Sequence, residues 1–346
     1  MKPKKSSVTI KEIAHQLGLS KSTVSRALHD SSEISLETKQ KIMALVEKLD
    51  YLPNPVALSL LKSRSYTLGV LVPEIDNPFF SAVISGIEEV AYNRGYHVTI
   101  YQSHECYERE VLNVKHIYTR RADGLIVSIS IETTTYDHFA RLQENAYPMV
   151  FFDRVWEESD VDKVVVDDFD GAYKATEHLI QQGCRRIAHL AGPETLAIGQ
   201  KRLHGYRAAM VDNNLSVPDE YIVRGDLTTE GALRVAGQLL DRPDRPDGIF
   251  SANDRMALGL HLAIRQRGLT IPDDLALIGF TNLPMATLID PPLSSMVQPA
   301  VEMGQTAARL LIERIENEGI SERVAATHVL KTTLLARQSS LRLLKV

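Results

Sequence analysis

The sequence has few of the features that mark secreted, membrane or redox proteins. Its 346 residues include two cysteines, Cys106 and Cys184, which are far apart and form no CxxC motif. We therefore expect two buried thiols in a reducing compartment. No apolar run approaches the roughly 18 residues that a membrane helix needs, and the basic N-terminus has no apolar signal core. These absences predict a cytoplasmic protein with no membrane partner.

The glycine and serine motifs of common α/β enzymes are also missing. No two of the 19 glycines are two or five positions apart, which excludes both GxGxxG and the Walker A loop. There is no GxSxG elbow. The tightest metal-like run, His104-Glu105-Cys106, lacks further ligands at the spacing of a zinc site. We therefore expect no enzyme activity, no catalytic residue, no metal and no cofactor.

Charge divides the chain into a basic head and an acidic body. Residues 1–65 contain 11 Lys/Arg and six Asp/Glu, a balance of +5. The whole chain has a net charge of −5, so the remaining residues have a balance of −10. This asymmetry favours contact with a polyanion through the head alone.

Residues 6–51 have the pattern of three short helices. Thr9 caps a helix over Ile10–Leu17, with Glu12 placed as in a capping box. Gly18 suits a turn, Ser20 caps a second helix and Ser35 caps a third. A helix, a tight turn and a second helix predict a helix-turn-helix.

The second of these helices separates apolar from polar side chains. Val24, Ala27 and Leu28 fall on the inner face. Lys21, Ser22, Ser25, Arg26 and His29 fall on the outer face, and this set offers donors to the major groove. The alternative is a three-helix interaction module with a solvated basic face.

Residues 52–65 form a connector with an apolar centre. Pro53 ends the third helix, Asn54 can cap a new one and Pro55 can begin it. The segment Val56–Leu61 is too short to be stable alone. We expect it to fold only against a partner, with Leu60 as a wedge in the minor groove. An ordinary polar linker is the alternative.

Residues 66–346 alternate apolar strands with helices, which predicts parallel sheets covered on both faces. Their length favours two similar lobes. The expected strands are Thr67–Val72, His97–Tyr101, Gly124–Ser128, Met149–Phe152, Arg186–Leu190, Gly248–Phe250 and Leu275–Gly279, with helices at Phe80–Arg94, Gly171–Gln182 and Arg255–Arg267.

Polar and aromatic side chains follow several of these strands. In doubly wound sheets such loops surround a ligand. The candidates are Asp76, Asn77, Phe79, Phe80, Asp153, Arg154, Arg202, Asn253, Asp254, Thr281 and Asn282. Carboxylates, amides and a guanidinium suit a polyhydroxylated ligand, with a phenylalanine on its ring face. Each residue alone is also an ordinary cap or turn former.

Motifs along the whole chain resemble the lactose/galactose repressor (LacI/GalR) family. The resemblance begins with VTIKEIAHQLGLSKSTVSRALHDSSEISLETKQKIMALVEKLDYLPNPVALSLL. It continues in family order through TLGVLVPEIDNPFFSAVISGIEE, DGLIVS, FFDR, HLAGP, RLHGYRAAM, ANDRMALG, LIGF and QPAVEMG. TVSRAL and NPVA together are highly specific.

This resemblance implies an all-α helix-turn-helix head (1–51), a hinge (52–65) and a two-lobed α/β domain (66–346) of the type I periplasmic-binding-protein-like fold. Two Rossmann-like lobes are implied, lobe one over about 66–165 and 298–325 and lobe two over about 166–293 and 326–340. It also implies a bacterial transcriptional repressor, located on the nucleoid when bound. It would bind a pseudo-palindromic, double-stranded operator as a homodimer, under control of a small-molecule effector. The chain ends without leucine heptads, which favours a dimer over a coiled-coil tetramer.

Family positions carry over to individual residues. Lys21, Ser22 and Arg26 match base-reading positions, whereas Ser20, Ser35, Tyr51 and Asn54 match backbone-contacting ones. Ala57 and Leu60 match the minor-groove hinge, although Leu58 stands where many members have Arg. Arg202 matches the effector-binding arginine, and Phe79, Phe80, Asp153 and Asn253 match cleft positions.

The sequence departs from sugar-binding members at the cleft. Thr281 stands where many have Asp, Leu227 where some have a stacking aromatic, and Leu196 and Ile198 are apolar. A sugar, a sugar phosphate and a nucleoside-like ligand all remain open, and Arg154 and Arg202 permit an anionic one.

Two other functions share parts of this pattern. A solute-binding protein would share the large domain, but it would have a signal sequence and no helix-turn-helix head. The same DNA-binding regulator could instead be controlled by a protein co-regulator rather than a small ligand.

Overall fold

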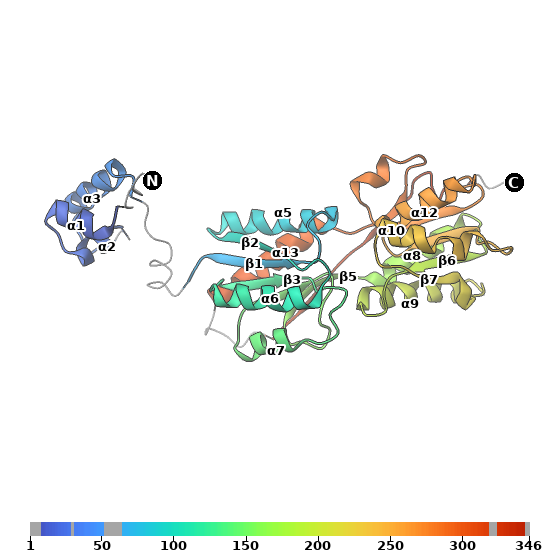
Figure 1. Ribbon diagram of the computed structural model, residues 1–346, viewed down its shortest axis with the longest axis horizontal. Coiled ribbons are helices and arrows are strands. Elements are labelled where there is room, and N and C mark those ends of the chain that lie inside the picture. The colour runs from blue at the N-terminus through green and yellow to red at the C-terminus, as the bar shows by residue number, and fades with distance from the viewer. Residues whose placement is uncertain (1–7, 29–30, 52–63, 318–323, 343–346) are drawn as a thin grey trace, which may run out of the picture. The chain divides into compact units, whose positions relative to one another are not determined.

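The computed structural model describes residues 8–28, 31–51, 64–317 and 324–342. The chain separates into two compact units, Met1–Ser65 and Tyr66–Val346, and each is described by itself (Figure 1). Among the described residues, no helix is long and apolar enough to cross a membrane.

The described part of the smaller unit contains three helices, α1 (Ile10–Leu17), α2 (Lys21–Leu28) and α3 (Leu36–Lys48). The capping box between Thr9 and Glu12 is present, and Gly18 closes α1 with φ 64°. The helices pack through a small apolar core of Ile13, Ala14, Val24, Ala27 and Ile42. Hence the predicted helix-turn-helix is present at the expected residues.

The larger unit contains two six-stranded sheets. Sheet one has the order β11-β5-β4-β3-β1-β2, and all its strand pairs are parallel. Its strands are β1 (Thr67–Val72), β2 (His97–Gln102), β3 (Gly124–Val127), β4 (Met149–Phe152), β5 (Asp162–Val166) and β11 (Thr327–Leu330).

Helices cover both faces of sheet one, as alternation along β1 requires. Leu68, Val70 and Val72 face α5 (Pro78–Asn93) and α13 (Ala300–Glu316). Leu71 points to the opposite core, which includes side chains of α6 (Tyr107–Thr119) and α7 (Asp137–Glu144). Figure 1 shows α5 on one side of these strands and α6 and α7 on the other.

Sheet two has the related order β12-β10-β9-β8-β6-β7, and only its β12–β10 pair is antiparallel. Its strands are β6 (Ile187–Ala191), β7 (Ile222–Arg224), β8 (Gly248–Ser251), β9 (Ala276–Thr281), β10 (Ser294–Val297) and β12 (Thr333–Leu335).

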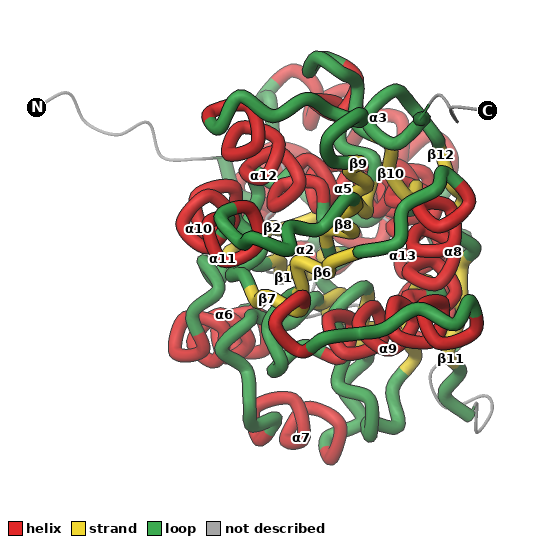
Figure 2. Tube along the Cα trace, turned by 90° about the vertical axis from the view of Figure 1, so that its right-hand side faces the viewer, coloured by secondary structure: helices red, strands yellow, loops and turns green. Residues whose placement is uncertain are grey.

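Five α-helices and two 3₁₀ turns accompany sheet two in the described part of the chain. One apolar core includes side chains of α8 (Asp168–Gln181) and α9 (Ala197–Asp212). The other core includes side chains of α10 (Thr229–Val235), α11 (Gly237–Leu240) and α12 (Asp254–Gln266). The 3₁₀ turns are Asp219–Tyr221 and Pro284–Thr287. Helices flank strands in both lobes (Figure 2).

Strand β11 corrects the expected lobe boundary at residue 326. Thr327–Leu330 pairs in parallel with Lys163–Val166 and therefore belongs to lobe one. The chain returns to sheet two only at β12. The short, half-exposed sequence of β11 lacks a buried apolar run, so its pattern does not reveal the sheet to which it belongs.

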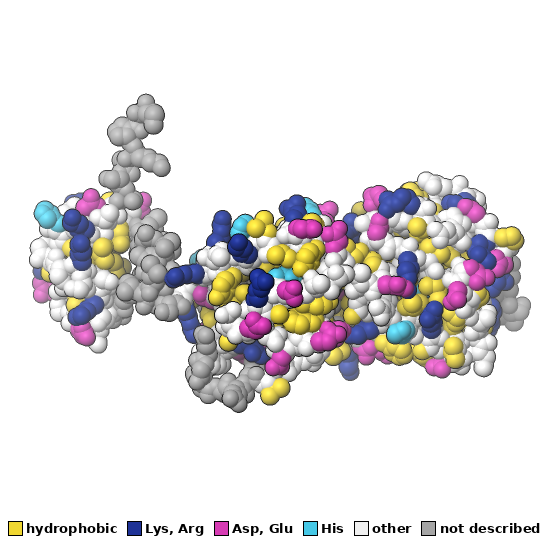
Figure 3. Space-filling model, turned by 60° about the horizontal axis from the view of Figure 1, so that its bottom comes forward, with side chains coloured by type: hydrophobic (Ala, Val, Ile, Leu, Met, Phe, Trp, Pro, Cys, Tyr) yellow, Lys and Arg dark blue, Asp and Glu magenta, His cyan; other side chains and the backbone are white. Residues whose placement is uncertain are grey.

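The two cysteines also differ from the expectation of two buried thiols. Cys184 is buried, but Cys106 is half-exposed just before α6. Both are free thiols. Figure 3 shows acidic and basic side chains interspersed over the visible face of the larger unit.

Candidate functional site

The outer face of α2 exposes the side chains expected to read bases. Lys21, Ser22 and Arg26 are exposed, while Val24 and Ala27 are buried in the head. Because the apolar side chains hold the helix against α1 and α3, the polar ones are left on one surface.

Serine hydroxyl groups cap the N-termini of α2 and α3. Ser20 Oγ accepts a hydrogen bond from Thr23 N at 3.0 Å, and Ser35 Oγ accepts one from Thr38 N at 3.3 Å. Tyr51 is half-buried against the head core. The hinge residues Asn54, Ala57 and Leu60 lie outside the described residues.

Arg26 is paired in the free protein. Its Nη1 lies 2.8 Å from Glu33 Oε2, with side chains 60% and 65% exposed. Such exposed pairs stabilise a fold by less than about 1 kcal/mol. The guanidinium can therefore exchange Glu33 for another acceptor at little cost.

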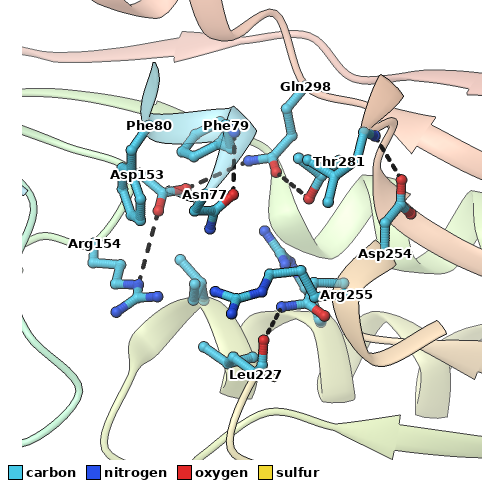
Figure 4. Close-up of a pocket in the computed structure, with 14 residues that line it drawn as sticks. Asn77, Phe79, Phe80, Asp153, Arg154, Leu227, Asp254, Arg255, Thr281 and Gln298 are labelled. Carbon is cyan, nitrogen blue, oxygen red and sulfur yellow. Dashed lines mark hydrogen bonds and ion pairs between the residues drawn. The ribbon is translucent and has the colours of Figure 1, made fainter. Parts of the chain in front are cut away.

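A pocket lies between the two lobes of the larger unit (Figure 4). Its cavity volume is about 40 Å³, and it is partly open to solvent. Its lining comprises Asn77, Phe79, Phe80, Asp153, Arg154, Ile198, Arg202, Leu227, Asn253, Asp254, Arg255, Thr281, Leu283 and Gln298. Nine of the eleven predicted residues are therefore brought together here.

The aromatic wall comes from the start of α5. Asn77 caps this helix by accepting a hydrogen bond from Phe79 N at 3.1 Å. The Phe79 and Phe80 rings lie edge to face, with centroids 5.3 Å apart. Phe80 also packs edge-on against Phe152 in β4. These contacts fix a rigid apolar surface beside the polar groups.

Asp153 is a buried acceptor on the lobe-one side of the pocket. Its side chain is 7% exposed, its Oδ2 lies 3.9 Å from Arg154 Nε, and its Oδ1 accepts a 3.4 Å hydrogen bond from Gln298. Burial raises the pKa of Asp153, an effect that Arg154 and Arg202 partly oppose. Its weak pairing leaves acceptor capacity for a ligand hydroxyl or N–H group.

Both arginines predicted from the sequence already have carboxylate partners. Arg154 Nη1 donates to both oxygens of Glu105, at 2.9 and 2.8 Å. Arg202 donates to Asp168 at 2.8 Å and to the Ala252 carbonyl at 2.6 Å. Burial raises the pKa of Asp168 to about 6 despite this ion pair. The positive charge of each guanidinium is therefore largely compensated by its carboxylate partner.

Asn253 and Asp254 hold the pocket loops together. Asn253 caps α12 by accepting from Met256 N at 2.8 Å and donates to the Leu227 carbonyl at 3.1 Å. Asp254 accepts from Leu283 N at 2.8 Å and from Ser295 Oγ at 2.7 Å. Burial raises the pKa of Asp254 to about 6.

Two predicted residues, Asp76 and Asn282, do not line the pocket. Asp76 is exposed at the turn before α5. The side-chain oxygen of Asn282 accepts from Arg337 Nη2 at 2.8 Å. A strand-end position therefore does not by itself decide which way a side chain points.

Three pocket residues were missed by the strand-end criterion. Arg255 and Leu283 directly follow predicted residues in sequence, and both side chains line the pocket. Gln298 lies in the motif QPAVEMG, where the chain passes from β10 to α13. For Gln298, this family motif was the sequence signal that could have indicated a pocket residue.

Three pocket residues have a positive φ angle. Asp153, Leu227 and Thr281 have φ values of 57°, 66° and 126°. Side chains other than glycine rarely adopt such values, which persist where the surrounding structure enforces them and cluster at functional sites. Because eight other non-glycine residues of the described chain also have positive φ, this conformation does not by itself mark the pocket as a site.

Another group of three possible metal ligands lies on lobe one. Ligand atoms of Cys106, Glu108 and Glu132 lie within 4.8 Å of one another among the described residues. Glu105, from the run noted in the sequence, is not part of this group and pairs with Arg154. Exposed acidic groups of this kind are common without a metal, and the group supports no metal role.

Two family descriptions match the chain, one in each unit. Residues 9–54 match the bacterial regulatory proteins of the lacI family, and residues 176–340 match the periplasmic binding protein-like domain.

Solved structures resemble nearly the whole chain. A Lac repressor dimer bound to operator and the anti-inducer ONPF has a TM-score of 0.85 at 25% identity, covering 97% of this chain and all of that one. A complex of the transcriptional regulator CelR with cellobiose has a TM-score of 0.74 at 28% identity, covering 96% and 99% of the two chains.

Curated relatives extend along the same length. The HTH-type transcriptional repressor CytR of Escherichia coli K12 is 34% identical over 322 residues, which cover 92% of this chain and 94% of CytR. The repressor PurR of Vibrio campbellii is 34% identical over 316 residues, covering 91% and 94%. The chain therefore belongs to the lacI family of bacterial regulatory proteins and is a DNA-binding transcriptional repressor.

Proposed function

We propose that this repressor binds a pseudo-palindromic operator as a homodimer and that a small molecule in the inter-lobe pocket sets its operator affinity. The observation that supports this most strongly is the pocket itself, in which polar groups and an aromatic wall converge between two lobes. The solved complexes of Lac repressor with ONPF and of CelR with cellobiose are consistent with a ligand at such a site.

Base recognition is assigned to Lys21, Ser22 and Arg26 on the exposed face of α2. Arg26 has the reach and the donors for guanine, the commonest specific contact in the major groove. Ser20, Ser35, Tyr51 and Asn54 are assigned to the phosphate backbone, where contacts fix position rather than sequence. Ala57 and Leu60 are assigned to the minor groove.

In this proposal, ligand binding and DNA binding are coupled through the angle between the two lobes. Two hydrogen-bonded contacts join them beside the pocket, Thr195 Oγ1 to the Ile131 carbonyl at 2.9 Å and Lys201 Nζ to Glu157 Oε1 at 2.6 Å. A ligand that favours one lobe angle changes the positions of the two hinges in the dimer. A coupling energy of 1–3 kcal/mol would change operator affinity about 5- to 150-fold.

Selection of bound duplexes from a random library tests the DNA half of the proposal. We expect enriched sequences with two half-sites in inverted order. Arg26→Ala should weaken binding to the selected operator by roughly 1–3 kcal/mol while changing binding to random DNA much less. Equal losses on both DNAs, or selection without an inverted repeat, would contradict the assignment.

A protein co-regulator is the second candidate for control of the same repressor. In a thermal-shift screen, a small-molecule effector raises the melting temperature by binding the native state. If no metabolite does so while a partner protein changes operator affinity, the co-regulator replaces the ligand.

A further inference from the structure

Three arginines line the pocket, but they differ in their partners. Arg154 is paired with Glu105 and Arg202 with Asp168, and both side chains are at most 6% exposed. An anionic ligand at either would compete with a carboxylate at hydrogen-bonding distance, half-buried Glu105 or buried Asp168. Neither arginine therefore offers an uncompensated positive charge.

Arg255 is the exception. It is the second residue of α12, half-buried, and in Figure 4 its side chain extends from this helix toward the pocket interior. Within the described residues its guanidinium has no hydrogen bond or ion pair. Its donors are available, and a planar guanidinium binds carboxylate and phosphate oxygens in pairs.

Among the described residues, no carboxylate forms an ion pair with Arg255. The two oxygens of Asp254 instead accept hydrogen bonds from Leu283 N and Ser295 Oγ. Asp153 lies on the other lobe, beside Arg154 and Gln298. The pocket thus has an acceptor, Asp153, on one lobe and a cationic donor, Arg255, on the other.

We infer that the effector is a hydroxylated small molecule with one anionic group, phosphate or carboxylate, and that Arg255 binds that group. Hydroxyl or N–H groups of the ligand donate to Asp153, and its flatter face packs on Phe79. A neutral sugar offers Arg255 only hydroxyl and ring oxygens, whose hydrogen bonds to a guanidinium are weaker than the charge-assisted pairs formed by a phosphate or carboxylate. This assignment rests on the proposed effector site.

Matched ligand sets test the inference by thermal shift and by titration calorimetry. Each set compares a neutral parent with its anionic forms, namely glucose with glucose 6-phosphate and glucuronate, ribose with ribose 5-phosphate, and adenosine with AMP. Inorganic phosphate at equal concentration controls for anions held elsewhere, including the DNA-binding surface. The phosphate and carboxylate members distinguish the two kinds of anion.

The wild-type chain should bind at least one anionic member more tightly than its parent. Arg255→Gln should weaken that binding roughly 10- to 100-fold, because a hydrogen bond to a charged group contributes about 1.5–3 kcal/mol. Arg255→Lys should retain part of the preference for the anion. Arg309→Gln, which removes a positive charge from the exposed side of α13, should leave it unchanged.

Two results would overturn the inference. One is that no anionic member binds more tightly than its parent, and the other is that Arg255→Gln keeps the preference. Operator affinity measured with the same compounds separates this inference from the proposed function. If an anion binds through Arg255 but leaves operator affinity unchanged, the ligand is not an effector, although Arg255 still binds anions. If a neutral sugar changes operator affinity, the pocket still controls DNA binding, but the effector is not anionic.

Discussion

Single carboxylates hold the loops around the pocket, and they do so at an electrostatic cost. Asp254 is 1% exposed and joins α12 to the loop after β9 and to β10 through Leu283 N and Ser295 Oγ. Gly279 leaves room for this carboxylate, because a Cβ at position 279 would lie 2.1 Å from Asp254 Oδ1. Burying the ionised carboxylate disfavours its charge, which is why its pKa rises.

Asp254→Asn should flatten the dependence of stability on pH. The native protein holds the Asp254 proton up to about pH 6, whereas an unfolded chain releases it near pH 4. The free energy of unfolding therefore falls as pH rises from about 4 to 6, by roughly 3 kcal/mol. Asparagine can still accept from Leu283 N and donate to Ser295 Oγ without this penalty.

Urea denaturation at pH 4.5 and pH 7 measures the effect. The stability of Asp254→Asn relative to wild type should be greater at pH 7 than at pH 4.5. Asp273→Asn, at an exposed position, is the control. An equal change with pH in wild type and Asp254→Asn would show that this carboxylate does not produce the slope.

Glu33→Gln should tighten operator binding several-fold. It releases Arg26 from its exposed ion pair and removes a negative charge beside the surface assigned to DNA. Stability should change by less than about 1 kcal/mol. Fluorescence anisotropy measures the affinity for the selected operator. The control is Glu37→Gln, which removes the exposed ion-pair partner of Lys41 on α3. Weaker or unchanged binding would argue against Arg26 as a base-reading residue.

At the scale of elements, helix pairs approach closely through glycines. A Cβ at Gly86 of α5 would lie 2.2 Å from the Val301 carbonyl oxygen of α13, and one at Gly304 would lie 2.0 Å from that of Val83. These two glycines let α5 and α13 pack backbone to backbone on sheet one. Gly205 of α9 has the same relation to Phe169 of α8, at 2.3 Å.

Gly304→Ala should therefore destabilise the larger unit by about 1–3 kcal/mol, because the added methyl group forces α5 and α13 apart. Chemical denaturation measures the loss. Ser85→Ala changes an exposed position of α5 beside the crossing and should have little effect. If Gly304→Ala is as stable as wild type, the close approach does not contribute to stability.

Elements with strong local signals were predictable from the sequence, whereas short ones were not. Thr9, Glu12 and Gly18 define α1 by capping chemistry alone, and Thr67–Val72 is a continuous apolar run. Strands β7 and β12 have three residues each, too few for a period to emerge. The same limit applies to β11, whose sheet is fixed by pairing with β5 across a long stretch of sequence.

The candidate site was predictable to a similar extent. The rule that ligands lie beyond strand ends locates the cleft, and most predicted residues line it. The rule does not reveal pairing, because Glu105 and Asp168 reach their arginines only in the folded chain. Arg255 therefore becomes distinctive only once the partners of Arg154 and Arg202 are known.

At the scale of the whole molecule, the larger unit consists of two similar lobes joined by three chain crossings. The lobes repeat one strand order, and the chain crosses between them after β5, β10 and β11. Beside the pocket they meet through the Thr195–Ile131 and Lys201–Glu157 contacts. Because the Lys201–Glu157 pair is about half-exposed, it holds the lobes only weakly and would oppose little a change of lobe angle by a ligand at the proposed site.

The most direct measurement is operator affinity of wild type and Asp153→Asn, titrated with the compounds that raise the wild-type melting temperature. The account predicts that at least one such compound changes wild-type operator affinity about 5- to 150-fold. Asp153→Asn should bind operator normally without the compound and should lose the response. If every stabilising compound leaves operator affinity unchanged, or if Asp153→Asn responds as wild type does, the pocket does not control DNA binding.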